Sequence, residues 1–401
     1  MSIYKFRNWA ALATNYVVTA GLTAISITMG GPWTFSIGAA AAAGLFGILY
    51  KFRNLSETML KEHRQSYEYS PLLGDIMNDL SHKAGFKSGE VKLYDFDVDH
   101  NKAKDRKEKE TFYKVGEIFD KMKRTPNAAA MGFGKPALMI SKKLLELLDN
   151  EEEKAVLAHE FAHLKAKHSW AKVPTSIVTT FARVSNSMAS IASLLSIGVV
   201  NALTTLVGSH YGTKIMGRMV DRKGLLTAEN HHLTERGEFN KAQMKNQLKT
   251  LTTCAVVAGV AVQSPAAGTI LVASHSIGIA FKIASGLLSR SNEYQADRVA
   301  VELGGNPISL ITSLQKLEAL KEKSLDKMFH GNVPKRSGLS KMWKTLTSTH
   351  PTTENRIKRL ADIAIGKGFD KTYVEHIVKS KPDVSRAPDI PYDIIKAALH
   401  A

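Results

Sequence analysis

The chain has 401 residues, 44% of them hydrophobic, and a formal net charge of +17. Its single cysteine, Cys254, excludes an internal disulfide and a zinc site built from cysteines. The positive charge is compatible with nucleic acid or with an anionic surface. No nucleic-acid-binding motif is present, and many basic residues flank apolar segments, so a membrane surface explains the charge better.

The N-terminal region, residues 1–53, contains a long uncharged stretch. Residues 8–50 carry no charged side chain, far more than the roughly 20 residues that one membrane span needs. A Gly-Gly-Pro turn at 30–32 divides the stretch, which predicts two transmembrane helices at about 9–29 and 33–50. Basic residues on both flanks place both ends on the cytoplasmic side. A cleaved signal peptide is the alternative for the first half, but the second apolar run follows it too closely.

Two further uncharged runs, residues 184–213 and 250–281, are long enough to span a membrane. Both are rich in small residues, which suit close helix packing in a bilayer. Buried helices of a soluble core, or helices lying on the membrane, are the alternatives. The 214–249 connection carries eight Lys/Arg against four Asp/Glu, which opposes placing it outside the cell. With or without this pair, an even number of crossings returns the chain to the same side.

The segments before the next helix predict a small sheet. Residues 54–85 have a helical pattern, and residues 90–96 alternate like a strand. Residues 97–125 mix both charge signs densely and are expected to form a solvated insertion. The segment from Asn127 to Ser141 carries apolar residues around two glycines and a proline, which indicates a hairpin or an irregular edge strand. Together these elements predict a mainly α-helical fold with a small β-sheet (α+β).

A well-defined helix start follows. Asp149 with Glu152 three residues later is typical of a capping box, with the aspartate at the N-cap. Two more glutamates in the first turn favour the positive end of the helix dipole. We expect the helix to continue to about His168.

The most informative pattern lies on this helix: His159-Glu160-x-x-His163. Two histidines four residues apart project from one face of a helix and can share one metal ion. Zinc accepts histidine nitrogen readily, and a glutamate between the histidines can take a proton from a metal-bound water. The pattern therefore favours a zinc-dependent peptide hydrolase.

A catalytic zinc needs a third protein ligand, with water in the fourth position. Glu293 is the best candidate, because it follows the last apolar run in a segment with helical character. Asp297 falls on the same face one turn later and could accept a hydrogen bond from a ligand histidine. Spacing alone leaves an equal alternative, in which two acids simply decorate a helix surface.

An ordered set of segments resembles the HtpX-like integral membrane zinc endopeptidases, gluzincins related to the CAAX prenyl proteases. Those segments are the N-terminal apolar pair, Ser70-Pro71-Leu72, Ala84-Gly85-Phe86, Asn127 to Ala130, Leu144-Leu145, Asp149, Ala158 to His163, Ser289-Arg290, Glu293 to Asp297, Asn306-Pro307, Leu314 to Leu317, Thr349-His350-Pro351 and Arg356-Ile357. The resemblance covers roughly residues 1–95 and 126–360. It implies a zinc peptidase domain over residues 54–362, interrupted by the apolar runs, and a C-terminal extension of unknown role over residues 363–401.

The resemblance also implies roles at one zinc ion per chain. His159, His163 and Glu293 would hold Zn²⁺, Glu160 would act as general base, and Asp297 would orient a ligand histidine. His350 and Arg356 would stabilise the oxyanion of the tetrahedral intermediate. For His350 the alternative is an extra zinc ligand in a resting state. For Arg356 the alternative is a structural ion pair.

The implied function is a membrane-bound zinc endopeptidase of protein quality control, cleaving unfolded or damaged membrane proteins. Substrates would bind as an added strand along Asn127 to Ser141, with the bilayer as a further partner and no nucleic acid. The expected location is the bacterial inner membrane, with the active site facing the cytoplasm. The alternatives are a CAAX-type prenyl-protein protease and a non-enzymatic membrane scaffold with a vestigial motif.

Overall fold

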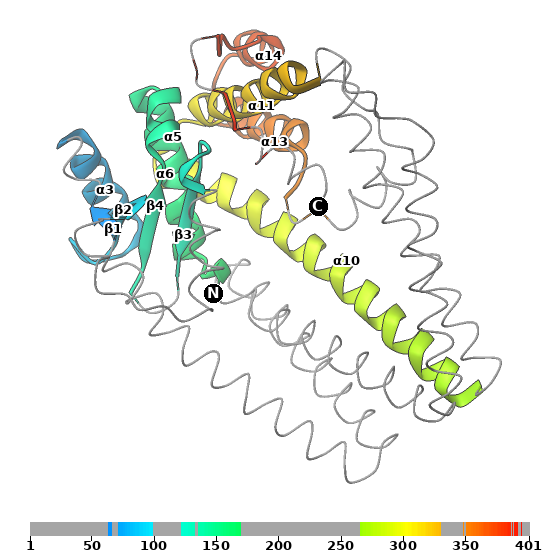
Figure 1. Cartoon of the computed structure of the whole chain (residues 1–401). Coiled ribbons are helices and arrows are strands. Elements are labelled where there is room, and N and C mark those ends of the chain that lie inside the picture. Colours follow the sequence, from blue (N-terminus) through cyan, green and yellow to red (C-terminus); the bar gives the residue numbers. More distant parts are fainter. Residues whose placement is uncertain are drawn as a thin grey trace. The chain divides into compact units, whose positions relative to one another are not determined.

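The computed structural model describes residues 63–65, 71–98, 122–132, 135–169, 265–329, 348, 350–385, 387, 389–391 and 394 (Figure 1). The chain divides into two compact units. The first comprises residues 1–177, 285–322 and 345–391, and the second comprises 178–284, 323–344 and 392–401. All the residues of the candidate site lie in the first unit. The predicted membrane helices at 9–29, 33–50 and 184–213 lie outside the described residues.

A mixed four-stranded sheet forms one layer of the first unit. Its strands are β1 (His63–Gln65), β2 (Lys92–Val98), β3 (Ala128–Met131) and β4 (Ala137–Ile140), in the order β1-β2-β4-β3. β2 and β4 are parallel, whereas β3 and β4 form an antiparallel hairpin in which Ala130 pairs with Leu138. Among the described strands β3 lies at the edge of the sheet, and of the two predicted alternatives for this segment, a hairpin or an irregular edge strand, the hairpin is the one observed.

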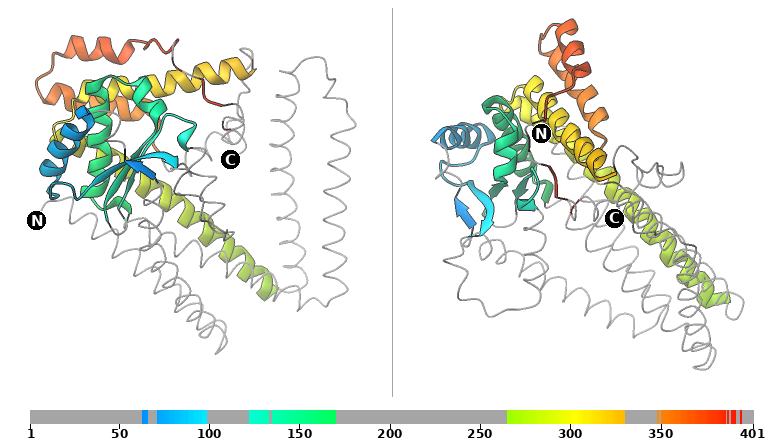
Figure 2. Two further views of the ribbon diagram at one scale, coloured as in Figure 1. Left: turned by 60° about the vertical axis from the view of Figure 1, so that its left-hand side comes forward. Right: turned by 45° about the horizontal axis from the view of Figure 1, so that its top comes forward.

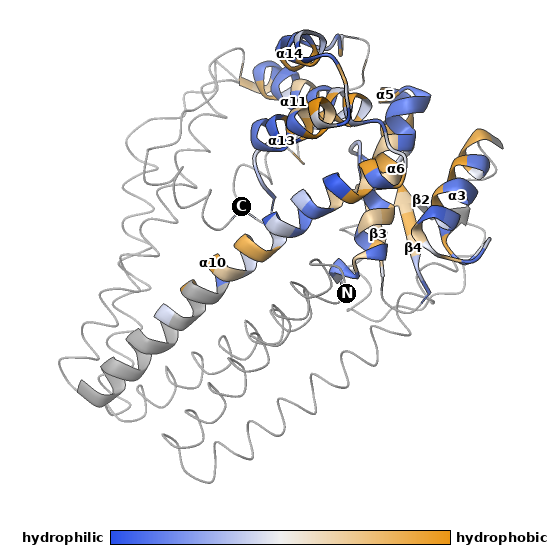
Figure 3. Ribbon diagram, turned by 180° about the vertical axis from the view of Figure 1, so that it is seen from behind, coloured by the Kyte–Doolittle hydropathy of each residue, from blue (hydrophilic) through white to orange (hydrophobic). Residues whose placement is uncertain are grey.

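Successive residues of a strand point to opposite faces, and this sheet buries side chains on both faces. Leu93, Leu138 and Ile140 face the main core, whereas Phe96 and Met139 belong to a smaller cluster on the opposite face. Helices α3 (Pro71–Ala84) and α6 (Asn150–Lys165) pack against each other in that main core (Figure 2). The central strand β4 is fully buried and uniformly hydrophobic (Figure 3). The predicted α+β class is confirmed by this arrangement.

One predicted element needs correction. Residues 54–85 have a helical pattern, but α3 begins only at Pro71, and His63–Gln65 is the strand β1. β1 is stabilised by antiparallel pairing with β2, a contact that no local pattern reveals. The predicted end of the helix is correct, since Gly85 follows α3 with a left-handed φ of 87°.

Helix α6 begins as the sequence predicts. The Asp149 side chain accepts a hydrogen bond from the Glu152 N–H at 2.9 Å, and the Glu152 carboxylate accepts one from the Asp149 N–H at 3.0 Å. This capping box satisfies two backbone donors at the helix start. Glu152 is buried and also pairs with Lys316, 2.6 Å away on α11 (Pro307–Phe329), so the start of α6 is fixed from two sides. The preceding helix is α5 (Lys142–Leu147).

Helix α10 (Pro265–Glu302) is a single helix of 38 residues. It includes the described end of the apolar run 250–281 and continues without a break through Glu293 and Asp297. Among the described helices, none has both the length and the apolar character that crossing a membrane requires.

The C-terminal helices pack against the core of the first unit. α13 (Thr353–Gly366) and α14 (Lys371–Lys379) start at the N-caps Thr352 and Asp370. The Gln315 side chain of α11 donates to backbone carbonyls near the end of α14, those of Ile377 and Val378. The Val378 carbonyl at the helix end thereby gains a partner, whereas the Ile377 carbonyl also accepts from Ser380.

Two glycines let α10 end directly against α6. Gly304 adopts a left-handed φ of 98°, and the Gly305 N–H donates to the Ala300 carbonyl at 2.9 Å, as in a Schellman motif. A Cβ atom on Gly305 would lie 2.9 Å from the Ala300 oxygen and 3.2 Å from Ala158 Cβ. Ala158 directly precedes His159, so this close approach brings the end of α10 onto the helix that carries the His-Glu-x-x-His pattern.

We therefore expect Gly305→Ala to destabilise the protein by about 1–3 kcal/mol, because the added methyl group must push α10 and α6 apart. Thermal unfolding of the purified chain measures the effect. Gly366→Ala is the matched control, since nothing lies within 4 Å of a Cβ there. An unchanged melting temperature for Gly305→Ala would show that the contact is loose.

Candidate metal centre

Helix α6 carries two histidines whose rings lie close together. His159 and His163 are one turn apart, and their Nε2 atoms lie 3.1 Å from each other. His159 is only 7% exposed, although neither helix propensity nor apolar packing requires a histidine there. Ala155, Ala158 and Ala162 are fully buried and let neighbouring elements approach this part of α6 closely.

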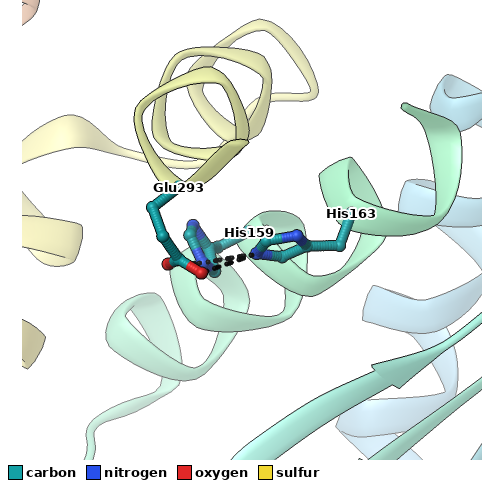
Figure 4. Close-up of side chains that lie close together, drawn as sticks. All are labelled: His159, His163 and Glu293. Atoms are coloured by element: carbon teal, nitrogen blue, oxygen red, sulfur yellow. Dashed lines mark hydrogen bonds and ion pairs between the residues drawn. The ribbon is translucent and has the colours of Figure 1, made fainter. Parts of the chain in front are cut away.

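Glu293 of α10 completes the cluster. Its Oε2 lies 3.5 Å from His159 Nε2, and its Oε1 lies 3.8 Å from His163 Nε2. Figure 4 shows the carboxylate and the two imidazoles pointing toward one another from the two helices. One ligand atom from each of the three residues lies within 4.8 Å of the other two.

These spacings fit a tetrahedral zinc ion. Ligand atoms at roughly 2.0–2.1 Å from zinc stand about 3.4 Å apart at tetrahedral angles. The three distances of 3.1, 3.5 and 3.8 Å bracket that value. Two imidazoles and one carboxylate are also the donor set of many catalytic zinc sites, which keep the fourth position open. The residues present therefore fit a zinc ion.

Asp297 orients His159 from one turn further along α10. Its Oδ1 lies 2.9 Å from His159 Nδ1, so the ring donates there and keeps the Nε2 lone pair free for a metal. Arg356 of α13 forms an ion pair with the same carboxylate. Its Nε lies 2.9 Å from Oδ2, and its Nη2 lies 2.5 Å from Oδ1. Its Nη1 lies 3.5 Å from Glu293 Oε2. One largely buried arginine, 12% exposed, thus holds both acids of α10.

The general-base candidate, Glu160, lies beside the edge strand. A backbone hydrogen bond from Ala130 of β3 reaches its carboxylate. Burial raises the pKa of Glu160, and the neighbouring Glu293 raises it further, while His159 and Arg356 oppose the shift. A base with a raised pKa suits proton transfer near neutral pH.

Opposing effects set the protonation of His159. Burial and the charge of Arg356 lower its pKa, but hydrogen bonds with Asp297 and Glu293 outweigh them and raise the pKa to about 9. For Glu293, burial raises the pKa, but hydrogen bonds from His159 and His350 dominate and bring the pKa well below its usual range. Without a metal, the site therefore favours an imidazolium facing a carboxylate.

This charge state predicts a pH-dependent affinity for zinc. His159 is mainly protonated below about pH 9 and must lose its proton to bind the metal. The apparent association constant should therefore rise about tenfold per pH unit between about pH 7 and 8.5. Competition with a chromophoric chelator, corrected for the chelator's own protonation, measures this slope. A constant affinity across that range would contradict the raised pKa.

His350 lies at the mouth of the site. Its Nδ1 is 3.2 Å from Glu293 Oε1, while 66% of its side chain is exposed. Ser348 shapes the segment by accepting from the His350 N–H, and Arg290 of α10 donates to the Ser348 carbonyl at 2.7 Å. The position allows either of the two predicted roles, donation to an oxyanion or ligation of the metal.

A cleft of about 480 Å³ opens onto this site. One side is formed by β3, and the ligand histidines, Glu160, Glu293, His350 and Arg356 all line it. A further apolar part is lined by side chains of α5, α6 and α11: Leu144, Val156, Leu310, Leu314 and Leu317. The cleft thus joins the metal centre, the edge strand and an apolar recess.

The structure brings together every residue predicted for the site: His159, Glu160, His163, Glu293, Asp297, His350 and Arg356. Their roles remain predictions. Two further residues were missed by the sequence reasoning, His168 and Gln295. His168 Nδ1 lies 2.8 Å from His163 Nδ1, and its Nε2 lies 3.3 Å from Gln295 Oε1. The only sequence signal was a third histidine five residues after His163.

A helix carrying His-Glu-x-x-His, with a glutamate supplied by a second helix, defines the class of HExxH metallopeptidases. Comparison with known proteins agrees with this class. Residues 102–235 and 221–364 match Peptidase family M48, and the chain belongs to that family.

Several curated relatives are named "Protease HtpX homolog". The protein of Aquifex aeolicus (strain VF5) is 27% identical over 249 residues, 60% of this chain and 63% of that protein. That of Methanopyrus kandleri is 27% identical over 250 residues, 60% of this chain and 57% of that protein. That of Salinibacter ruber is 42% identical over 84 residues, 19% and 30% respectively. The chain thus spans less than two thirds of each of these relatives.

The predicted resemblance to HtpX-like metallopeptidases is confirmed by these matches. The predicted enzyme class, a metalloprotease and hence a hydrolase, is confirmed at the level of the family.

Proposed function

We propose that the chain is a membrane-bound, zinc-dependent endopeptidase that cleaves unfolded or damaged membrane proteins in protein quality control. One observation carries the proposal. His159, His163 and Glu293, from two helices far apart in sequence, bring ligand atoms to tetrahedral spacing beside the partly buried Glu160. A helix surface that merely carried acids would not bury Glu293 against two imidazoles.

A bound Zn²⁺ supplies Lewis acidity that polarises a water molecule and the substrate carbonyl. Glu160 accepts the proton of the attacking water as the new carbon–oxygen bond forms. It then delivers that proton to the amide nitrogen as the carbon–nitrogen bond breaks. Its contact with Ala130 keeps the carboxylate next to the strand along which the substrate would lie.

The outer edge of β3 suits an extended substrate. Among the described strands β3 pairs with β4 alone, and its alanines line the cleft. A peptide added to this edge would pair with the backbone through main-chain hydrogen bonds, which select extended chains rather than sequences. Small side chains at residues 128–130 leave room for it. This supports unfolded polypeptides as the substrate class.

His350 suits oxyanion stabilisation better than Arg356 does. Arg356 is 12% exposed, and two of its nitrogens are engaged by Asp297 while a third faces Glu293. His350 is largely exposed at the cleft and is held near the metal centre by one carboxylate contact. We therefore propose that His350 stabilises the oxyanion and that Arg356 holds Asp297 and Glu293 in place.

His350→Ala tests this assignment. As an oxyanion donor, His350 should contribute about 10²–10³-fold to kcat, with zinc affinity unchanged. Steady-state cleavage of a quenched fluorescent peptide, together with a zinc titration, separates the roles. A variant whose zinc affinity falls instead would identify His350 as the additional ligand.

The whole proposal is tested by incubating the detergent-solubilised chain with casein, an unfolded protein. Cleavage should stop with a chelator and return with added zinc. Cleavage insensitive to the chelator would remove the metal from the mechanism, and no cleavage at all would favour the scaffold alternative. A farnesylated CAAX peptide cut in preference to casein would instead favour the prenyl-protein protease.

The membrane part of the proposal rests on the sequence. The uncharged stretch 8–50, with basic residues on both flanks, supports an anchor whose two ends share the cytoplasmic side. We propose the bacterial inner membrane with a cytoplasmic active site. Fractionation after alkaline washing would leave such a protein in the membrane pellet, and release into the supernatant would contradict the anchor.

A further inference from the structure

The two ligand histidines of α6 are held by different partners. His159 donates to a carboxylate, Asp297, whereas His163 Nδ1 faces the Nδ1 atom of a third histidine, His168, 2.8 Å away. The His163 and His168 rings meet edge to face, with centroids 4.9 Å apart and planes at 75°. His168 is 1% exposed, and full burial is uncommon for a histidine ring.

The backbone after α6 explains how His168 reaches His163. Five residues on a continuous helix would turn the two side chains about 140° apart. α6 ends at Lys165 instead, and Lys167 adopts a left-handed φ of 54°, which costs a residue other than glycine about 1–2 kcal/mol. This break after α6 lets the His168 ring pack against His163 rather than point away from it.

The other end of His168 contacts the second ligand-bearing helix. His168 Nε2 lies 3.3 Å from Oε1 of Gln295, which is two residues after Glu293 on α10. An amide oxygen only accepts, so His168 donates from Nε2 and keeps a lone pair on Nδ1. That lone pair accepts the Nδ1 proton of His163. In this direction the Nε2 atom of His163, which faces His159 and Glu293, carries no proton.

The opposite direction of donation is incompatible with a metal. If Gln295 donated to His168, then His168 would donate to His163 Nδ1, and the His163 proton would have to occupy Nε2. A protonated nitrogen offers no lone pair to a metal ion. Two hydrogen bonds link Gln295, His168 and His163. Only one direction of proton donation along them leaves His163 able to bind a metal ion.

We propose that His168, itself oriented by Gln295, is a positioning residue that sets the tautomer and ring orientation of His163 for zinc binding. This rests on the proposed zinc site. Outer partners of ligand histidines typically contribute 10–100-fold to metal affinity. His168 contacts both His163 of α6 and Gln295 of α10. The orientation of a histidine ligand therefore depends on the helix that supplies the carboxylate ligand.

Two substitutions of nearly equal size separate orientation from packing. His168→Asn retains an acceptor at the δ position, next to His163 Nδ1, whereas His168→Leu does not. Zinc affinity, measured by chelator competition, should fall about 10–100-fold in His168→Leu and only a few-fold in His168→Asn. The visible spectrum of the cobalt-substituted protein should change in His168→Leu and be nearly retained in His168→Asn. His376→Leu, at an exposed position of α14, is the control and should match the original chain.

The outcomes are distinct. Wild-type affinity in His168→Leu, or an equal loss in both variants, would overturn the positioning role while leaving the zinc site intact. Gln295→Met provides an independent test, because it retains the size of the side chain but removes the oxygen acceptor. It should weaken zinc binding several-fold, and unaltered binding would overturn the assigned direction of donation. An original chain that binds no zinc would overturn the proposed function and this inference with it.

Discussion

Glu160→Gln is expected to bind zinc like the original chain and to lose about 10²–10⁴-fold of its proteolytic rate. Glutamine retains the size of the side chain and can still hydrogen-bond to a water molecule, but it cannot accept a proton. Glu160 itself is not among the three residues whose ligand atoms converge, so metal binding should be unaffected. The effect should be on kcat rather than on KM, because the interaction is made only in the transition state.

The measurement combines peptide cleavage with zinc analysis of the same preparation. Glu151→Gln is the matched control, since Glu151 lies in the first turn of the same helix and is exposed. It should retain full activity. A Glu160→Gln variant that cleaves at the original rate would remove Glu160 from the proton transfer, whatever the zinc content.

The second large effect is expected for Glu293→Ala. The substitution removes one of three protein ligands and the negative charge that faces His159 and His163. Its cost in zinc affinity should therefore exceed the 10–100-fold typical of residues that merely orient a ligand. Proteolysis should fall with metal occupancy and recover in part at high zinc concentration.

Atomic absorption of the dialysed protein gives the occupancy directly. Glu302→Ala is the control on the same helix, where the carboxylate is exposed and pairs only locally with Arg298 at 3.3 Å. It should retain one zinc per chain. Full occupancy in Glu293→Ala would exclude Glu293 as a ligand and would require a different third donor.

The parts of the site that could be predicted depend on local signals. The capping box at Asp149, the four-residue spacing of the histidines and the propensity of the intervening alanines are all encoded within one helix. Local sequence therefore predicted the start of α6 and the face that carries both histidines correctly, although the helix ends at Lys165 rather than near His168. Glu293 was assigned by resemblance, since spacing alone left a surface helix equally possible.

The parts that could not be predicted depend on distant contacts. β1 is only three residues long and exists because β2 provides a partner, so its local pattern suggested a helix. His168 was overlooked because helical geometry directs it away from His163, and only the left-handed Lys167 reverses this. The contact of Gln295 with His168 depends on the packing of α10 near α6, which no local pattern reveals.

The division of the ligands between α6 and α10 has a consequence for synthesis of the enzyme. A growing chain presents both histidines of α6 long before Glu293 and Asp297 are made, and long before Arg356 joins them. Two imidazoles alone do not make a catalytic zinc site, which takes three protein ligands. The hydrolytic centre therefore assembles only after translation of the C-terminal helices. Chains that end before α10 should therefore lack hydrolytic activity.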